Sequence, residues 1–236
     1  MKYETPVAVA FSDVSMPSDP VVVRNARLRS HKNWSDIAIR VSDILISSVA
    51  LAFLLPALLV VALLVKFQDG GPSLYGQRRI GLNGREFRCL KFRSMHVNSD
   101  EILAKLLRED REAHAEWQAD HKLRNDPRIT ALGRFLRKSS IDELPQLLNV
   151  LRGDMSLVGP RPIVRSEVCK YGKSFEFYMS VLPGITGLWQ VMGRNDVTYR
   201  RRVALDRLYS QRRTVKLYYQ ILFMTIPAVL FQRGSY

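Results

Sequence analysis

The stretch ILISSVALAFLLPALLVVALLV, Ile44–Val65, contains no charged residue over its 22 positions. As an α-helix it would be roughly 33 Å long, at about 1.5 Å per residue. That length is enough to cross a bilayer core of about 30 Å. Because the stretch is apolar on every side, we favour insertion into a membrane over burial in the core of a soluble domain. The sequence therefore predicts a membrane-inserted helix within residues 34–66.

Two topologies remain open for this helix. Pro56 lies near its middle, where proline removes one helix hydrogen bond and clashes with the preceding turn. Basic residues flank both ends, for example Arg40 before and Lys66 after, so Lys and Arg show no bias toward one side. A helix that breaks at Pro56 and leaves through the face by which it entered would explain both observations. We expect this re-entrant form, and a spanning helix is the alternative.

The rest of the sequence divides around this helix. Residues 1–33 are polar and contain several prolines, which predicts a mobile tail. Residues 67–236 are long enough for a cytosolic domain. The net charge of +14 indicates an anionic partner: nucleic acid, an anionic membrane or a phosphorylated substrate. Cys89 and Cys169 are far apart, which argues against a disulfide framework or a zinc site and fits a reducing compartment.

A β-hairpin is predicted within Ser73–Met95, because Asn83-Gly84 is a strong turn signal between two alternating runs. Lys91 and Arg93 lie two positions apart at the end of the second strand, and therefore on one face. Two basic side chains on one face could bind phosphates. From spacing alone, an exposed basic edge that discourages aggregation is an equally good interpretation.

Two acids stand side by side at the start of the run IDELPQLLNVLRGDMSLVGPRP, Ile141–Pro162. One interpretation is structural: Ser140-x-x-Glu143 matches a capping box at the start of a Leu-rich helix that ends at Gly153. The other is chemical. A preceding basic helix, which Thr130 would cap, carries Arg137 toward Asp142 and Glu143, and nearby cations keep carboxylates ionised. An ionised carboxylate is what a nucleophile or a metal ligand requires.

Other segments add a polar helix, basic loops and an apolar end. Asp100–His121 is predicted to be a charged, amphipathic helix. Arg161 stands between two prolines in a rigid loop, where its forked guanidinium suits phosphate. The glycine-rich loop Leu182–Asp196 offers Arg194 and the aromatic Trp189. The apolar run Leu217–Phe231 is too short to span a membrane and predicts an interfacial helix. The expected fold class is α+β, mainly helical, with a membrane-inserted helix and a cytosolic domain containing a β-hairpin and interfacial amphipathic helices.

The chain resembles the bacterial polyprenyl-phosphate phosphoglycosyl transferases of the monotopic type. The matching motifs, in family order, are KFRSM (Lys91–Met95), DPRIT (Asp126–Thr130), IDELPQLLNVLRGDMSLVGPRP (Ile141–Pro162) and PGITGLWQVMGRND (Pro183–Asp196). The resemblance covers roughly residues 34–236 and is nearest to enzymes that start exopolysaccharide synthesis with a galactose phosphate. One departure concerns the membrane helix: Leu55 stands before Pro56, where the family commonly has a small polar residue.

The resemblance implies a mechanism. Asp142 would be the nucleophile that takes the sugar phosphate from a UDP-sugar, releases UMP and passes the sugar phosphate to undecaprenyl phosphate. Glu143 would be a catalytic residue that binds Mg²⁺. Lys91, Arg137 and Arg161, and more distantly Arg194, would bind phosphate or shape the site. The enzyme would lie in the bacterial inner membrane with its catalytic domain on the cytoplasmic face, among membrane lipids and with downstream glycosyltransferases as further partners.

Three alternatives stay beside this one. A noncatalytic scaffold of polysaccharide assembly would share the fold. A nucleic-acid-binding domain would share the charge, but no binding motif for nucleic acid is present, so we expect no nucleic-acid partner. Within the enzyme class the donor could carry glucose or an N-acetylhexosamine in place of galactose. The sequence leaves the sugar, the polysaccharide and the oligomeric state undetermined.

Overall fold

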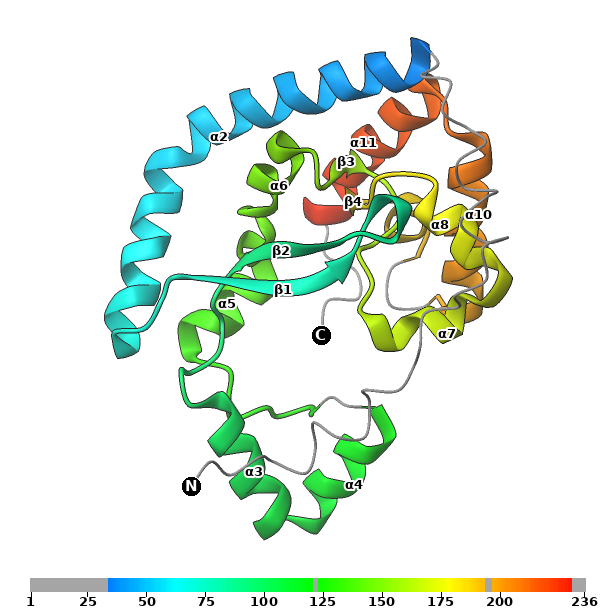
Figure 1. Cartoon of the computed structure of the whole chain (residues 1–236). Coiled ribbons are helices and arrows are strands. Elements are labelled where there is room, and N and C mark those ends of the chain that lie inside the picture. Colours follow the sequence, from blue (N-terminus) through cyan, green and yellow to red (C-terminus); the bar gives the residue numbers. More distant parts are fainter. Residues whose placement is uncertain (1–33, 121–122, 194–196, 231–236) are drawn as a thin grey trace.

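The structure is a computed structural model that describes residues 34–120, 123–193 and 197–230. The tail predicted for residues 1–33 lies outside the described residues. The molecule is mainly helical, with two small two-stranded sheets. A long apolar helix, α2 (Trp34–Asp69), borders the other elements along one side and bends part-way along its length (Figure 1). Pro56 lies within α2, and proline is the usual cause of such a bend.

The hairpin predicted around Asn83-Gly84 is confirmed. Strand β1 (Leu74–Ile80) pairs antiparallel with β2 (Glu86–Phe92), and Tyr75 lies opposite Lys91. Asn83 and Gly84 both have positive φ angles, of 57° and 75°. This is the backbone requirement that makes Asn-Gly a turn signal.

The polar segment after the hairpin forms two helices instead of the single helix predicted over Asp100–His121. Helix α3 (Ser99–Glu109) ends at Asp110, whose backbone is extended, and α4 (Arg111–Asp120) follows. The Asp110 carboxylate accepts hydrogen bonds from the amides of Glu112 and Ala113 and so starts the second helix. His121 lies outside the described residues. Figure 1 shows α3 and α4 extending away from α2, beyond the hairpin.

The capping box predicted at Ser140 is wrong. Helix α5 (Ala131–Ser139) starts at the predicted Thr130 cap, whose Oγ1 accepts from the Gly133 amide at 2.8 Å. Ser140 then ends α5 in the left-handed conformation, with φ of 58°, and its side chain caps nothing. A 3₁₀ turn, Ile141–Glu143, separates it from α6 (Gln146–Arg152). Helix α6 ends at Gly153 as predicted.

Buried Asn149 of α6 joins this helix to the hairpin. Its Oδ1 accepts from the Leu90 amide at 2.9 Å, and its Nδ2 donates to the Arg88 carbonyl at 2.8 Å. Both bonds reach the backbone of β2. They fix the strand that carries Lys91 against the segment that carries Asp142 and Glu143.

A second, parallel sheet carries the Arg161 loop. Strand β3 (Ser156–Val158) pairs with β4 (Gly184–Thr186). A Cβ on Gly184 would lie 2.0 Å from the Gly159 nitrogen, so this approach requires glycine. The remaining helices are α7 (Val168–Tyr171), α8 (Phe175–Met179), α9 (Leu188–Val191), α10 (Tyr199–Arg212) and α11 (Val215–Leu230).

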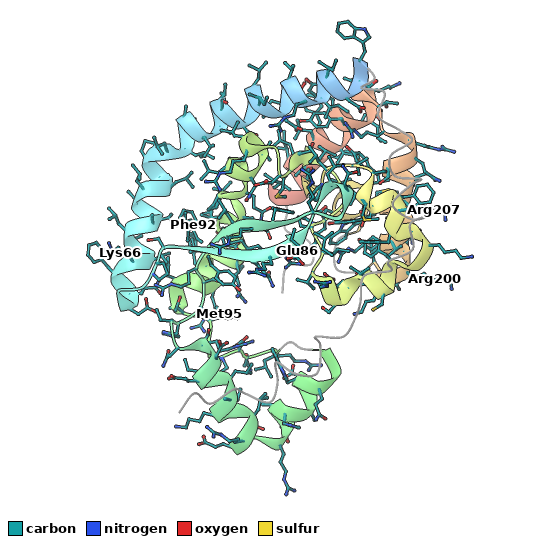
Figure 2. The ribbon with its side chains drawn as sticks, viewed as in Figure 1. Lys66, Glu86, Phe92, Met95, Arg200 and Arg207 are labelled. Carbon is teal, nitrogen blue, oxygen red and sulfur yellow. The ribbon has the colours of Figure 1, made fainter. Side chains whose placement is uncertain are left out.

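Both halves of α2 pack on the same body of the molecule. In the first half, Asp43 is buried and accepts hydrogen bonds from the Leu157 amide and the Tyr218 hydroxyl, at 2.9 and 2.8 Å. In the second half, Val65 packs with Phe92 and Leu136. The outward side chains of α2 point away from the other elements (Figure 2). They are mostly large and apolar, and include Val49, Phe53, Leu59, Val60, Leu63 and Phe67.

Candidate active site

A cavity of about 1100 Å³ opens between the second strand of the hairpin, α5, the 3₁₀ turn, α9 and α11. The structure brings most of the predicted site residues to this cavity: its lining includes Lys91, Arg93, Arg137, Asp142, Glu143 and Arg161. Several of them are far apart in the sequence, so the fold itself assembles the cluster. An open cavity with convergent charged groups is the usual form of a small-molecule site.

Lys91 is the centre of this cluster. Its Nζ lies 2.5 Å from Glu143 Oε1, within hydrogen-bonding distance, and 3.9 Å from Asp142 Oδ2. The ammonium therefore faces both carboxylates from the end of β2. Among the described residues no hydrogen bond is made to Glu143 Oε2.

The two carboxylates differ in their acidity. Burial acts to raise the pKa of Glu143, but Lys91 and Arg161 outweigh it and hold that pKa below its usual range. Burial raises the pKa of Asp142, the negative charge of Glu143 adds to this, and Lys91 and Arg137 counteract it only in part. The predicted effect of the nearby cations therefore dominates at Glu143, whereas burial outweighs it at Asp142. Two neighbouring carboxylates with opposed pKa shifts are a frequent property of active sites.

Arg137 reaches the site from the last turn of α5. Its Nε donates to Ser94 Oγ at 2.8 Å. The contact depends on Gly133, because a Cβ there would lie 2.0 Å from the Ser94 carbonyl oxygen. Ser94 follows the hairpin directly, so this one close approach positions α5 against the strand that carries Lys91.

The other predicted residues have different surroundings. Arg161 lines the cavity from its loop between Pro160 and Pro162. Arg93 lines it too, but its guanidinium pairs with Asp69 and donates to the Val65 carbonyl, so it holds the end of α2. Arg194 lies outside the described residues. Pro56 is inside α2 and is not part of the cavity lining.

Two residues of the site, Arg128 and Arg79, were missed from the sequence. Arg128 lines the cavity and is paired with Asp126 at 2.7 Å, and the motif DPRIT contained the signal for it. Trp189, the aromatic residue that the glycine-rich loop was expected to offer, does line the cavity, from α9. Arg79 borders the smaller hollow next to Glu143 and Arg161, and no local pattern pointed to it.

The donor set suits a magnesium ion only together with a substrate. Among residues 34–120, 123–193 and 197–230 no group of three or more His, Cys, Asp or Glu side chains could hold a metal. Mg²⁺, however, usually binds through one or two carboxylates plus substrate phosphates and keeps several waters. Asp142 and Glu143 are two adjacent carboxylates that line a cavity large enough for a nucleotide sugar, so they fit this mode of binding.

The chain matches known proteins over most of its length. The model of the bacterial sugar transferase family matches residues 34–232. Exopolysaccharide production protein ExoY of Rhizobium meliloti is 52% identical over 200 residues, which cover 85% of this chain and 88% of that protein. The UDP-glucose:undecaprenyl-phosphate glucose-1-phosphate transferase of Caulobacter vibrioides is 40% identical over 209 residues, or 85% of this chain and 73% of the other. The undecaprenyl-phosphate galactose phosphotransferase of Salmonella typhimurium is 56% identical over 169 residues, which are 72% of this chain but 36% of that longer protein.

Proposed function

This chain belongs to the bacterial sugar transferase family, and from that premise we propose that it transfers a sugar 1-phosphate from a UDP-sugar to undecaprenyl phosphate and releases UMP. Galactose is the favoured sugar, because relatives at 49% and 56% identity are named for galactose transfer to a lipid carrier. The reaction would be the first step of exopolysaccharide synthesis, in keeping with the name of the Rhizobium relative. The observation that carries the proposal is the adjacent Asp142 and Glu143 pair in a cation-lined cavity.

Asp142 is the proposed nucleophile. Its carboxylate attacks the β-phosphorus of the UDP-sugar, a P–O bond to Asp142 forms, and the bond to the bridging oxygen breaks, so that UMP leaves. An oxygen of undecaprenyl phosphate then attacks the same phosphorus, and the Asp142 carboxylate is the leaving group. Covalent catalysis of this kind divides one difficult displacement between anions into two steps. The burial of Asp142 limits its hydration, which leaves the carboxylate available for attack once it is ionised.

The cations around the pair have distinct roles in this proposal. Lys91 faces both acids and favours the ionised form of Asp142. Arg161 and Arg137 both line the cavity and would hold phosphate oxygens by charge-assisted hydrogen bonds. Glu143 and substrate oxygens would hold Mg²⁺, which supplies Lewis-acid stabilisation of the phosphates.

The membrane topology is the second part of the proposal. The described residues contain one helix, Trp34–Asp69, that is long and apolar enough to cross a membrane by length and composition. We place this helix in the inner membrane as a re-entrant element, with residues 67–236 on the cytoplasmic face. The support is that Asp43 and Val65, in opposite halves of α2, contact the same body of the molecule. Helix α11 adds Phe223, Met224 and Ile226 as an exposed apolar face for the interface.

A second donor, UDP-glucose, is favoured by one finding. The Caulobacter relative, which this chain matches over 73% of its length, is named for glucose 1-phosphate transfer. The chemistry at Asp142 would be the same for both sugars, so only the sugar-binding part of the cavity would differ.

The test is UMP release by detergent-solubilised protein with Mg²⁺, undecaprenyl phosphate and a panel of UDP-sugars. We expect release with UDP-galactose, and its loss in Asp142→Asn. The control is Glu109→Gln, which removes an exposed acid at the end of α3 and leaves the cavity unchanged. Release with UDP-glucose alone would favour the second donor. No release with any sugar from well-folded protein would contradict the proposal and favour a scaffold.

A further inference from the structure

Arg161 lies on a loop, and its direction depends on what holds that loop. The segment that follows it is fixed to β1 by an antiparallel bridge between Ile80 and Ile163. The buried Tyr178 hydroxyl donates to the Ile80 carbonyl at 2.6 Å and accepts from the Ile163 amide at 3.2 Å. These contacts lie outside the large cavity, so they hold the loop without facing a substrate there.

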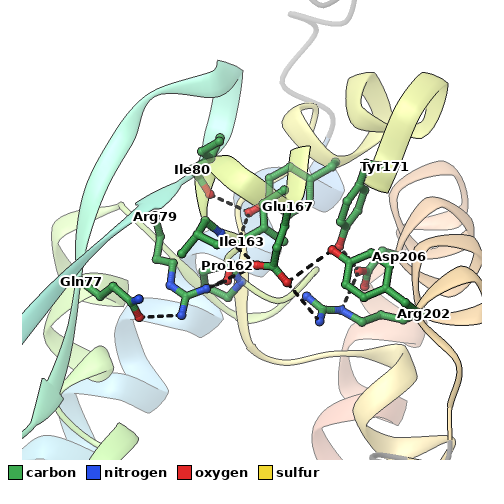
Figure 3. Close-up of polar contacts among 12 residues, drawn as sticks. Gln77, Arg79, Ile80, Pro162, Ile163, Glu167, Tyr171, Arg202 and Asp206 are labelled. Atoms are coloured by element: carbon green, nitrogen blue, oxygen red, sulfur yellow. Dashed lines mark hydrogen bonds and ion pairs between the residues drawn. The ribbon is translucent and has the colours of Figure 1, made fainter. Parts of the chain in front are cut away.

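Both neighbours of Arg161 are held by hydrogen bonds. The Pro160 carbonyl accepts from the Gly184 amide at 2.8 Å, and the Pro162 carbonyl accepts from Arg79. Arg79 Nη1 donates to the carbonyl of Pro162, the next residue after Arg161, at 3.0 Å, and Arg79 Nη2 donates to Gln77 Oε1 at 2.6 Å (Figure 3). Gln77 thus fixes one arm of the guanidinium fork while the other arm holds the loop. Only 14% of the Arg79 side chain is exposed. A fork with two directed donors fixes an angle as well as a distance, which the single ammonium of lysine does not.

A buried guanidinium next to another cation requires a counter-charge. Arg79 and Arg161 border the same small hollow, together with Lys91 and Glu143. Glu167 Oε2 lies 3.7 Å from Arg79 Nη1 and accepts from the Val164 amide at 3.0 Å. Glu167 therefore compensates the charge of Arg79 and at the same time holds the loop at Val164, two residues after Pro162.

The arrangement continues to α10. Arg202 lies 4.0 Å from Glu167 and 4.0 Å from Asp206, and the Tyr171 hydroxyl donates to Asp206 at 2.8 Å (Figure 3). Arg202 and Asp206 both belong to α10, a helix of 14 residues that also packs on α8 and α9. Glu167, the counter-charge of Arg79, is therefore itself paired with Arg202 of α10, so the loop is also connected to that helix.

We propose that Arg79 is a positioning residue for Arg161: by holding the Pro162 carbonyl, it directs the Arg161 guanidinium toward the Lys91–Glu143 pair and the substrate phosphates. This inference rests on the proposed function. Arg79 itself need not contact the substrate. Its replacement by lysine keeps the positive charge but loses the fork, so the turnover number is expected to fall about 10- to 100-fold, in the range found for small misplacements of catalytic groups.

The experiment is a double-mutant cycle on the turnover number for UMP release, with Arg79→Lys, Arg161→Gln and the double variant. If Arg79 acts through Arg161, the Arg79→Lys change has little further effect once Arg161 is gone. Arg78→Lys is the matched control, because Arg78 is exposed on the neighbouring position of the same strand and should tolerate the change. Melting temperatures are measured for every variant.

Full turnover in Arg79→Lys, or additive losses in the double variant, would overturn the positioning role of Arg79. The proposed function would still stand in that case, provided that the wild type is active. An inactive wild type would instead overturn the proposed function. If Arg79→Lys fails to fold, Gln77→Leu takes its place. This variant removes the acceptor that orients the fork. Because Gln77 also lines the large cavity, the deciding result is whether its loss of turnover disappears once Arg161 is replaced, and an additive loss would overturn the positioning role.

Discussion

Lys91 Nζ lies 2.5 Å from Glu143 Oε1 and 3.9 Å from Asp142 Oδ2, although the lysine and the acids are about fifty positions apart in the sequence. One ammonium thus faces two adjacent carboxylates, and all three residues line the cavity. The pair of acids would repel each other without it. This contact connects the hairpin to the segment that carries the proposed nucleophile.

Replacing Lys91 should change the pH dependence of the reaction. Lys91 is the strongest influence that lowers the pKa of Asp142 against its burial. In Lys91→Met that pKa rises further, so a smaller fraction of Asp142 is ionised at a given low pH. The acid limb of the turnover-number profile should therefore move to higher pH, and the maximum should fall about 100- to 1000-fold as one stabilising donor is lost.

The profile is measured by UMP release in detergent for the wild type, Lys91→Met and the control Lys105→Met. Lys105 is exposed on α3. An acid limb in Lys91→Met at the wild-type position would show that Lys91 does not control the ionisation of Asp142.

Gly133→Ala should move α5 away from Ser94 and the hairpin strand that carries Lys91. Its Cβ would lie 2.0 Å from the Ser94 carbonyl oxygen, so α5 must move away and the Arg137–Ser94 hydrogen bond must lengthen. Both stability and the turnover number are expected to fall. Thr130→Ala is the matched comparison, because it removes the cap of the same helix at a cost of about 1 kcal/mol and adds no clash.

These two variants are compared by melting temperature and by UMP release per folded molecule. Thr130→Ala should lose stability and keep most of its turnover, whereas Gly133→Ala should lose both. Equal turnover in the two variants would mean that the close approach at Ser94 does not position the site.

The raised pKa of Asp206 predicts that the stability of the folded protein depends on pH. Burial raises this pKa from 3.8 to about 7, while Tyr171 and Arg202 act in the opposite direction. Between these two pH values the unfolded chain has an ionised Asp206 and the folded chain a protonated one. The unfolded state therefore binds fewer protons, and the stability falls as the pH rises from about 4 to 7.

Asp206→Asn removes this ionisation but keeps an oxygen that can accept from Tyr171. Its melting temperature should match the wild type near pH 4 and exceed it by roughly 10 °C at pH 8. A rise of the pKa from 3.8 to about 7 corresponds to about 4 kcal/mol, and about 1 kcal/mol corresponds to roughly 2–4 °C for a chain of this size. A constant difference at both pH values would contradict the raised pKa.

The re-entrant topology predicts that positions before and after α2 face the same compartment. Single cysteines at Arg24 and Arg78, in protein with Cys169→Ser, can be labelled by a membrane-impermeant maleimide. Cys89 is buried and should not react. Both positions should be labelled in inverted inner-membrane vesicles and neither in spheroplasts. Labelling of the two positions from opposite sides would establish a spanning helix.

Local signals predicted the hairpin and the start of α5. Asn83-Gly84 needs positive φ angles that few other residues adopt, and Thr130 needs only the amide three residues later. Both requirements are met within a few residues, so the pattern is visible in the sequence. The long apolar helix was also predicted from a local pattern, the uncharged run Ile44–Val65.

For two predictions that differed from the structure, the cause was a contact between residues far apart in the sequence. The Ser140–Glu143 pattern fits a capping box, but Ser140 ends the preceding helix in a left-handed conformation. The Glu143 carboxylate accepts a hydrogen bond from Lys91 instead. Alternation placed Arg93 beside Lys91, yet its guanidinium pairs with Asp69 at the end of α2. Arg79 donates to Pro162, 83 positions away, and Asp43 accepts from Leu157, 114 positions away, so no local pattern could reveal these two contacts.

The most direct measurement is the mass of the protein after incubation with UDP-sugar and Mg²⁺ in the absence of undecaprenyl phosphate. A covalent intermediate should appear as a mass increase of one hexose phosphate, mapped by peptide analysis to Asp142, and it should disappear when undecaprenyl phosphate is added. Asp142→Asn should show no increase, and Glu109→Gln should behave as the wild type. UMP release by wild-type protein with no adduct, or an adduct on another residue, would contradict the assignment of Asp142 as the nucleophile.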